Sequence, residues 1–108
     1  MRGLVFENLV IAETLKRHTH AGQNPELYFY RDDSKIEVDF IDVTDRSAPE
    51  LIEIKSTTSF KADLARHLES VGDLLDIPRE GRSVVLRSDA SYVVNGVTFW
   101  SAHDWLMR

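Results

Sequence analysis

Three acidic residues and a lysine stand at strand spacing in the middle of the chain. One residue separates Glu37 from Asp39 in an apolar segment, and one residue separates Glu53 from Lys55 in the next. Because side chains on a strand return to the same face at every second residue, each pair shares a face if both segments are strands. Carboxylates crowded on neighbouring strands repel one another unless a divalent cation or a base offsets their charge. The spacing therefore favours a metal site.

The residue types narrow the choice of metal. Asp39 and Glu53 supply oxygen ligands, the chain has no cysteine, and no histidine falls in this cluster, which favours Mg²⁺ or Mn²⁺ over Zn²⁺. Mg²⁺ commonly takes one or two carboxylates together with waters and a phosphate oxygen, an arrangement suited to phosphodiester hydrolysis. Lys55 can orient the attacking water or stabilise the transition state. We expect metal ligands at Asp39 and Glu53 and a catalytic role for Lys55.

A further carboxylate belongs to a predicted N-terminal helix. No Gly or Pro interrupts residues 4–17, and Leu4, Ile11 and Leu15 fall on one stripe at the helical period. Glu7 lies between Leu4 and Ile11 on this stripe, so its side chain should point towards the body of the protein. A carboxylate in that position needs a partner.

The other predicted elements alternate in type along the chain. We expect a hairpin of two strands over 27–30 and 36–43, the second with a bulge at Phe40–Ile41 or burial on both faces, and a central strand over 51–55. A helix, a strand, a hairpin turning at Asn95-Gly96 and a terminal helix after Ser101 follow. The expected fold class is α/β or α+β.

The acidic residues also carry a resemblance. Glu7 in a first helix, Asp39 in a second strand and Glu53-Ile54-Lys55 in a third resemble the PD-(D/E)xK superfamily, although Val38 stands where the name has Pro. The resemblance implies a restriction-endonuclease-like fold, with a central mixed β-sheet flanked by helices and an αβββαβ core. It implies metal at Asp39 and Glu53, an auxiliary acid at Glu7 and a catalytic Lys55.

A narrower resemblance covers nearly the whole chain. Four segments are similar to the uncharacterised domain that follows AAA-type ATPase modules in many prokaryotic proteins: residues 3–8, 28–32, 37–40 and 52–56. It implies that residues 1–108 form one nuclease-like domain, the C-terminal part of a larger ATPase. If so, apolar surface that once met the ATPase should be bare and promote self-association, with Trp100, Trp105 or Leu9 as contacts.

Composition limits the partners. The chain has 108 residues, of which 13 are Lys or Arg and 18 are Asp or Glu, giving a net charge of −5. Without a broad basic field, binding to DNA should be weak for this chain alone. No stretch approaches about 18 uncharged apolar residues, so no membrane partner is expected. The absence of cysteine fits a reducing compartment, and we expect the cytoplasm.

Two other interpretations stay open. An Asp followed by Glu-x-Lys also arises by chance, and such residues can form cross-strand ion pairs worth about 0.2–1 kcal/mol each. Alternatively, the fold is kept as a catalytically inactive regulatory or protein-interaction module of the ATPase. Among nearby polar residues, we expect Glu37 to be an ion-paired neighbour, Asp42 to belong to a charged rim and His18 to be exposed.

Overall fold

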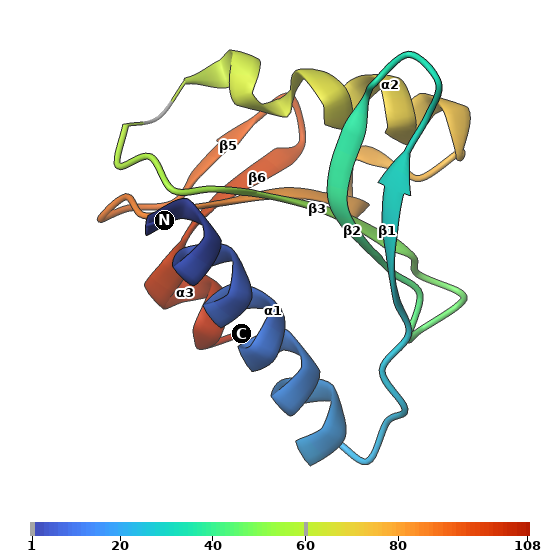
Figure 1. Ribbon diagram of the computed structural model, residues 1–108, viewed down its shortest axis with the longest axis vertical. Helices are drawn as coiled ribbons and strands as arrows, with labels where there is room; N and C mark the ends of the chain where they lie inside the picture. Colours follow the sequence, from blue (N-terminus) through green and yellow to red (C-terminus); the bar gives the residue numbers. More distant parts are fainter. Residues whose placement is uncertain (1, 60) are drawn as a thin grey trace.

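One six-stranded sheet organises the part of the chain that the computed structural model describes, residues 2–59 and 61–108 (Figure 1). The elements in chain order are α1 (Arg2–His20), β1 (Leu27–Arg31), β2 (Glu37–Asp42), β3 (Glu50–Lys55), a 3₁₀ turn (Ala62–Ala65), α2 (Arg66–Leu74), a second 3₁₀ turn (Arg79–Gly81), β4 (Arg82–Leu86), β5 (Tyr92–Val94), β6 (Val97–Ser101) and α3 (Ala102–Leu106). The strand order across the sheet is β1-β2-β3-β4-β6-β5. The predicted mixture of helices and strands is confirmed as an α+β fold.

The strand carrying Glu53 and Lys55 lies inside the sheet, as predicted. β3 pairs antiparallel with β2 and parallel with β4, which in turn is parallel to β6. Leu51 and Ile52, which point to opposite faces, are both fully buried. Each face of β3 is therefore covered, and a charged side chain on this strand is forced into contact with the layers above or below.

Two apolar layers cover the sheet. The layer on one face includes residues from β3, β4, β6 and α2, among them Leu51, Val84, Phe99, Leu68 and Val71. The layer on the other face joins the sheet to α1 and α3, and includes Ile52, Val85, Phe6, Val10 and Trp105. Figure 1 shows α2 on one side of the sheet and α1 with α3 on the other. Residues at odd positions of β3 thus face α2, and those at even positions face α1.

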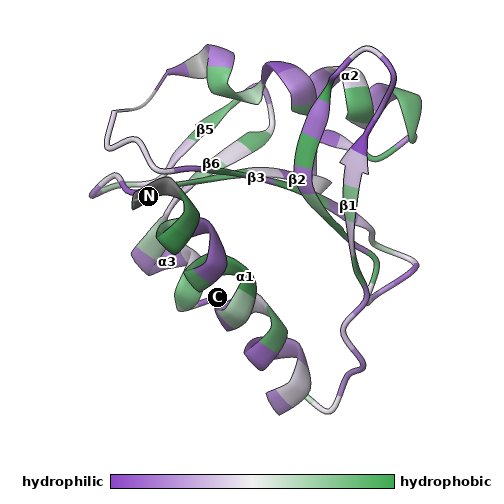
Figure 2. Ribbon diagram, viewed as in Figure 1, coloured by the Kyte–Doolittle hydropathy of each residue, from purple (hydrophilic) through white to green (hydrophobic). Residues whose placement is uncertain are grey.

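The predicted packing stripe of α1 is wrong at Leu4 and Leu15, whereas Ile11 is half-buried and packs against the core as predicted. Leu4 is 58% exposed and Leu15 is also exposed, whereas the buried side chains of this helix are Phe6, Val10 and Thr14. The reason is Thr14, whose hydroxyl donates to the Val10 carbonyl at 2.7 Å and accepts the indole N–H of Trp105 at 3.1 Å. A satisfied polar residue thus occupies the core face, and apolar residues remain on the outer face (Figure 2).

Trp105 is almost fully buried, which contradicts its expected role in self-association. It packs under α1, and the guanidinium groups of Arg17 and Arg108 lie over its ring. Trp100 is half-buried, and Leu9 is exposed as that expectation requires. No helix within residues 2–59 and 61–108 is long and apolar enough to cross a membrane.

Local signals placed the C-terminal elements correctly. Asn95 and Gly96 both have positive φ, 53° and 81°, as a two-residue turn between β5 and β6 requires. The Ser101 hydroxyl accepts the backbone N–H of Asp104 at 3.1 Å and caps α3. α2, in contrast, begins only at Arg66, without a side-chain cap, because the 3₁₀ turn at Ala62–Ala65 precedes it.

Candidate functional site

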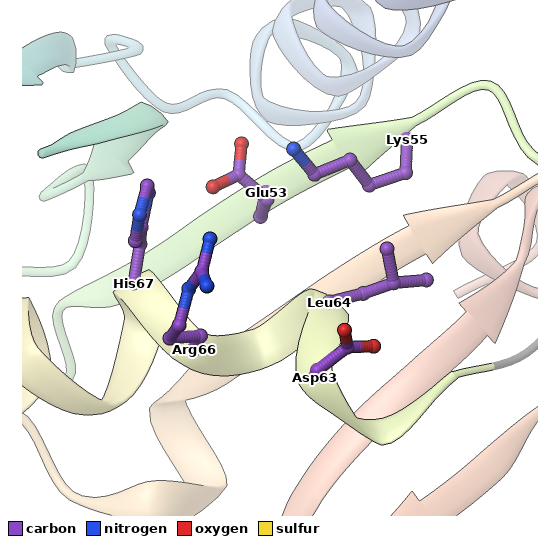
Figure 3. Close-up of a pocket in the computed structure, with 6 residues that line it drawn as sticks. All are labelled: Glu53, Lys55, Asp63, Leu64, Arg66 and His67. Atoms are coloured by element: carbon purple, nitrogen blue, oxygen red, sulfur yellow. The ribbon is translucent and has the colours of Figure 1, made fainter.

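Glu53 and Lys55 point to the α2 face of β3, because they alternate with Ile52 and Ile54, which belong to the α1 layer. Glu53 is buried, with 4% of its surface exposed, whereas Lys55 at the end of the strand is half-buried. Figure 3 shows both side chains on the same side of β3, with the amine of Lys55 turned towards the carboxylate of Glu53. The predicted pairing of these two residues on one face is confirmed.

A bulge in β2 places Asp39 beside them. Tyr28 pairs with Ile41 and Tyr30 with Val38, so two residues of β2, Asp39 and Phe40, stand opposite one residue of β1. Such a bulge bends the strand and redirects its side chains. The predicted bulge at Phe40–Ile41 is therefore confirmed next to that position, at Asp39–Phe40. Because of the bulge, the side chain of Asp39 does not follow the regular alternation of β2.

The bulge also ends the pairing of β2 with β3. The paired residues are Phe40 with Ile52, Ile41 with Leu51 and Asp42 with Glu50, so the pairing in this part of the sheet ends at Phe40. At the next position the Asp39 carboxylate accepts the backbone N–H of Ile54 at 2.6 Å. A side chain thus replaces the strand partner, and the carboxylate is held against β3 next to Glu53.

Asp39 and Glu53 are close enough to share a proton. Burial, the hydrogen bond to Asp39 and the charge of Asp39 together raise the pKa of Glu53 to about 9, with burial as the largest cause. The ammonium of Lys55 opposes this shift, and the charge of Glu7 adds to it. At neutral pH the Glu53 carboxyl therefore keeps its proton and donates a hydrogen bond to the Asp39 carboxylate.

Glu7 completes the set from the opposite layer. It follows Phe6, a buried residue of α1, and lies at the edge of the packed face of the helix rather than in its middle. Its pKa is raised by burial and then by the charge of Asp39, whereas Lys55 lowers it. One hollow of about 270 Å³ is lined by all of the predicted site residues, Glu7, Asp39, Glu53 and Lys55.

A model of the family described as "Domain of unknown function (DUF4143)" matches residues 2–105, which is almost the entire chain. The chain belongs to the DUF4143 family. Comparison with curated proteins and with solved structures found no match. The family's description assigns no activity, so the chemistry of this DUF4143 domain is inferred from the four residues around the hollow.

Residues that sequence reasoning missed form the walls of this DUF4143 site. Lys35, from the turn between β1 and β2, and His67, from α2, line the hollow with the four predicted residues. The expectation that no histidine lies in the cluster is thus wrong. The sequence carries little indication that His67 belongs to the site, because only the packing of α2 over β3 brings residue 67 close to residue 53. Arg66 of α2 lines a second hollow together with Glu53 (Figure 3).

The expectations for three neighbouring residues have mixed outcomes. Glu37 is exposed and pairs with Arg31 at 3.4 Å, as predicted. Asp42 is buried instead of lying on a charged rim, because its carboxylate contacts Nε2 of His18 at 2.6 Å. His18 is therefore held in place and is not an exposed residue of a frayed helix end. Neither Asp42 nor His18 lines the hollow that holds Glu53.

The donor atoms at this site fit a hard cation. Asp39, which is half-buried, and Glu53, which is buried, together offer carboxylate oxygens, and the raised pKa of Glu53 reflects a position where a nearby positive charge would be favourable. In the described ranges, no three His, Asp or Glu side chains are grouped so as to hold a metal by themselves. A cation at the pair would therefore take its other ligands from water and substrate, as Mg²⁺ commonly does.

Proposed function

We propose that the chain is a metal-dependent phosphodiesterase domain that cleaves DNA with Mg²⁺ or Mn²⁺. The observation that carries the proposal is the convergence, around one hollow, of three carboxylates and a lysine from three separate elements: Glu7 of α1, Asp39 of β2, and Glu53 and Lys55 of β3. The pKa values of Glu7 and Glu53 are raised by burial and by the charge of Asp39, and carboxyl groups with raised pKa values in a hollow are typical of sites that bind a cation or transfer protons.

The four residues divide the work. Asp39 and Glu53 would hold the cation, with Glu53 giving up its proton. When bound, a divalent cation neutralises charge on the phosphate and makes water a better nucleophile. Lys55, which faces Glu53, would donate hydrogen bonds to a phosphate oxygen as negative charge builds up. Glu7, with its raised pKa, would accept or return a proton at the edge of the hollow.

The element order supports a restriction-endonuclease-like assignment. Up to β4 the chain runs α1, β1, β2, β3, α2, β4, which is the αβββαβ order of that class. The carboxylates lie where β2 leaves β3, and the lysine follows two residues after Glu53. These features agree with the sequence resemblance, and the proposal places Asp39 and Glu53 in the metal-ligand positions of that superfamily.

We further propose an AAA-type ATPase module as partner, in the same or another chain, and a cytoplasmic location. Because of its net charge of −5, this chain should have low affinity for DNA by itself, so the ATPase would supply DNA binding and targeting. The outer face of α1 carries exposed apolar residues, Leu4, Val5 and Leu9. Such a face suits contact with another module or self-association through a second copy.

One observation favours the alternative of an inactive regulatory or protein-interaction module. The Glu53 carboxyl already donates a hydrogen bond to Asp39, so the pair is satisfied without a cation. Calorimetry with Mg²⁺ and Mn²⁺, with and without DNA, separates the two functions. Binding of the cation at millimolar concentration by the wild type, and its loss in Glu53→Gln, supports the hydrolase. No cation binding either with or without DNA favours the inactive module.

Cleavage assays test the hydrolase directly. Single- and double-stranded DNA are incubated with Mn²⁺ and the wild-type chain, Asp39→Asn, Lys55→Ala or the control Lys16→Ala, which removes an exposed lysine of α1. We expect Asp39→Asn and Lys55→Ala to lose activity by about 10²–10³-fold or more, since each removes a group that stabilises charge in the transition state. The control should cleave like the wild type. Equal cleavage by all four proteins would indicate contamination and exclude the proposed activity.

A further inference from the structure

The hollow that holds the acidic pair continues into a second hollow under α2. Glu53, Lys55 and His67 line both. The first, of about 270 Å³, also includes Lys35, and the second, of about 140 Å³, also includes Arg66. We call the joined hollows the trough. Glu53 belongs to both hollows, whereas Lys35 lines only the first and Arg66 only the second, and we call the parts with Lys35 and Arg66 the two ends of the trough.

The turn between β1 and β2 presents Lys35 to the trough in an unusual backbone conformation. Lys35 has φ 63°, in the left-handed region that favours glycine. Asp32 holds the turn, because its carboxylate accepts the backbone N–H groups of Ser34 at 2.8 Å and Ile36 at 3.1 Å. A lysine in this conformation costs about 1–2 kcal/mol relative to one in the right-handed region. Residues in sparsely populated backbone conformations occur in turns and cluster at ligand-binding sites.

Arg66 reaches the other end of the trough from the first turn of α2. Figure 3 shows its guanidinium turned towards Glu53, beside the imidazole of His67. Within residues 2–59 and 61–108 neither Arg66 nor Lys35 forms an ion pair. Other arginines in these ranges do pair with carboxylates: Arg31, Arg46, Arg79, Arg82 and Arg108. In an acidic chain, two cations without such partners at the ends of one trough are available for an external anion.

We propose that Lys35 and Arg66 bind two phosphates of a single nucleic-acid strand, one on each side of the phosphodiester that lies over Glu53. The inference rests on the proposed hydrolase function for the identity of that central bond. The contacts are made to the backbone, so they position the strand without reading its sequence. His67 lines both hollows of the trough. Its Nδ1 lies 3.3 Å from the carbonyl oxygen of Glu37, so it links α2 to β2.

Fluorescence anisotropy of a labelled single-stranded DNA oligonucleotide in EDTA tests the contacts without cleavage. The proteins are the wild type, Lys35→Ala, Arg66→Ala, and the controls Lys16→Ala and Arg79→Ala, which remove exposed, ion-paired cations outside the trough. We expect Lys35→Ala and Arg66→Ala each to weaken binding about tenfold. Each should also reduce the slope of log affinity against log salt by about 0.7, the value for one phosphate contact on a single strand. The controls should match the wild type.

The outcomes separate this inference from the proposed function. Wild-type affinity and salt slope in both Lys35→Ala and Arg66→Ala overturn the inference, as does equal loss in the controls or no measurable binding by the wild type at low salt. If the wild type cleaves DNA while both variants bind and cleave normally, only the inference fails. If both variants lose binding as expected but the wild type never cleaves with Mg²⁺ or Mn²⁺, the trough stands and the hydrolase function fails.

Discussion

Asp42 and Glu53 are two buried carboxylates of the same sheet, 3% and 4% exposed, with opposite surroundings. Asp42 contacts Nε2 of His18 at 2.6 Å, and its second oxygen accepts the backbone N–H of Thr44 at 3.0 Å. Glu53 instead faces another carboxylate, Asp39, and its pKa is raised to about 9. Both positions lie inside the sheet, so burial alone does not distinguish them.

The difference lies in what the fold supplies to each acid. A buried carboxylate is costly unless it is paired with a cation or a hydrogen-bond donor. Asp42 receives hydrogen-bonding partners from the chain itself, the imidazole of His18 and the backbone N–H of Thr44, and so links α1 to the end of β2. Glu53 is buried beside the like charge of Asp39, which the ammonium of Lys55 opposes only in part, so its carboxyl keeps a proton instead. This difference is what the proposed cation site rests on.

The pH dependence of stability gives the largest test of this contrast. Glu53 has a raised folded-state pKa, so its contribution to stability is complete below about pH 4.5 and is lost as the pH rises towards about 9. The free energy of unfolding should fall across this window by up to about 1.4 kcal/mol per pH unit. Glu53→Gln should remove that part of the slope, since glutamine is neutral at every pH.

Urea unfolding of the wild type, Glu53→Gln and Asp42→Asn over this pH range measures the effect. Asp42→Asn should keep the part of the slope that comes from Glu53, because it leaves Asp39 and Lys55 in place. Parallel profiles for the wild type and Glu53→Gln would show that Glu53 ionises normally, and the contrast with Asp42 would then be lost. Adding Mg²⁺ near pH 8 should stabilise the wild type but not Glu53→Gln, if the pair holds the cation.

Removing Asp42 should have a smaller effect, confined to stability. Asp42→Ala leaves His18 and the backbone N–H of Thr44 without their acceptor, which should lower the free energy of unfolding by about 2–3 kcal/mol. The matched control is Glu50→Ala, opposite Asp42 in the β2–β3 register and paired with Arg108 nearer the surface. That pair should contribute about 0–1 kcal/mol. Equal losses of the free energy of unfolding in the two variants, measured by urea unfolding, would mean that the buried Asp42 contributes no more to stability than the more exposed Glu50.

Local patterns predicted much of the fold and the centre of the site. Alternation placed Glu53 and Lys55 on one face of an inner strand, and the parity change in β2 indicated the bulge that positions Asp39. The Asn95-Gly96 turn needed only its own two residues. Each of these signals acts over a few residues, where backbone geometry alone decides which side chains share a face.

The rest depended on contacts between distant segments. Hydrophobicity placed Leu4 on the packed face of α1, but Thr14 takes part in that face because Trp105, 91 residues away, donates to it. Asp42 looked like a surface acid because its partner His18 belongs to a different element. Lys35 and His67 reach the site only after the β1–β2 turn and α2 have packed, and no spacing in the sequence relates them to Glu53.

The smallest expected effect concerns Glu7, which tests whether the third carboxylate belongs with Glu53. The charge of Glu7 is a minor cause of the raised pKa of Glu53, so Glu7→Gln should move the titration of Glu53 slightly towards lower pH. Carbon-detected NMR of the glutamate side-chain carboxyls follows this titration. Glu13→Gln, which removes an acid from the same helix that pairs with Lys16, is the control and should leave it unchanged. An unchanged or upward-shifted titration of Glu53 in Glu7→Gln would show that the charge of Glu7 does not raise the pKa of Glu53. The proposed role of Glu7 as an auxiliary acid would then have no support.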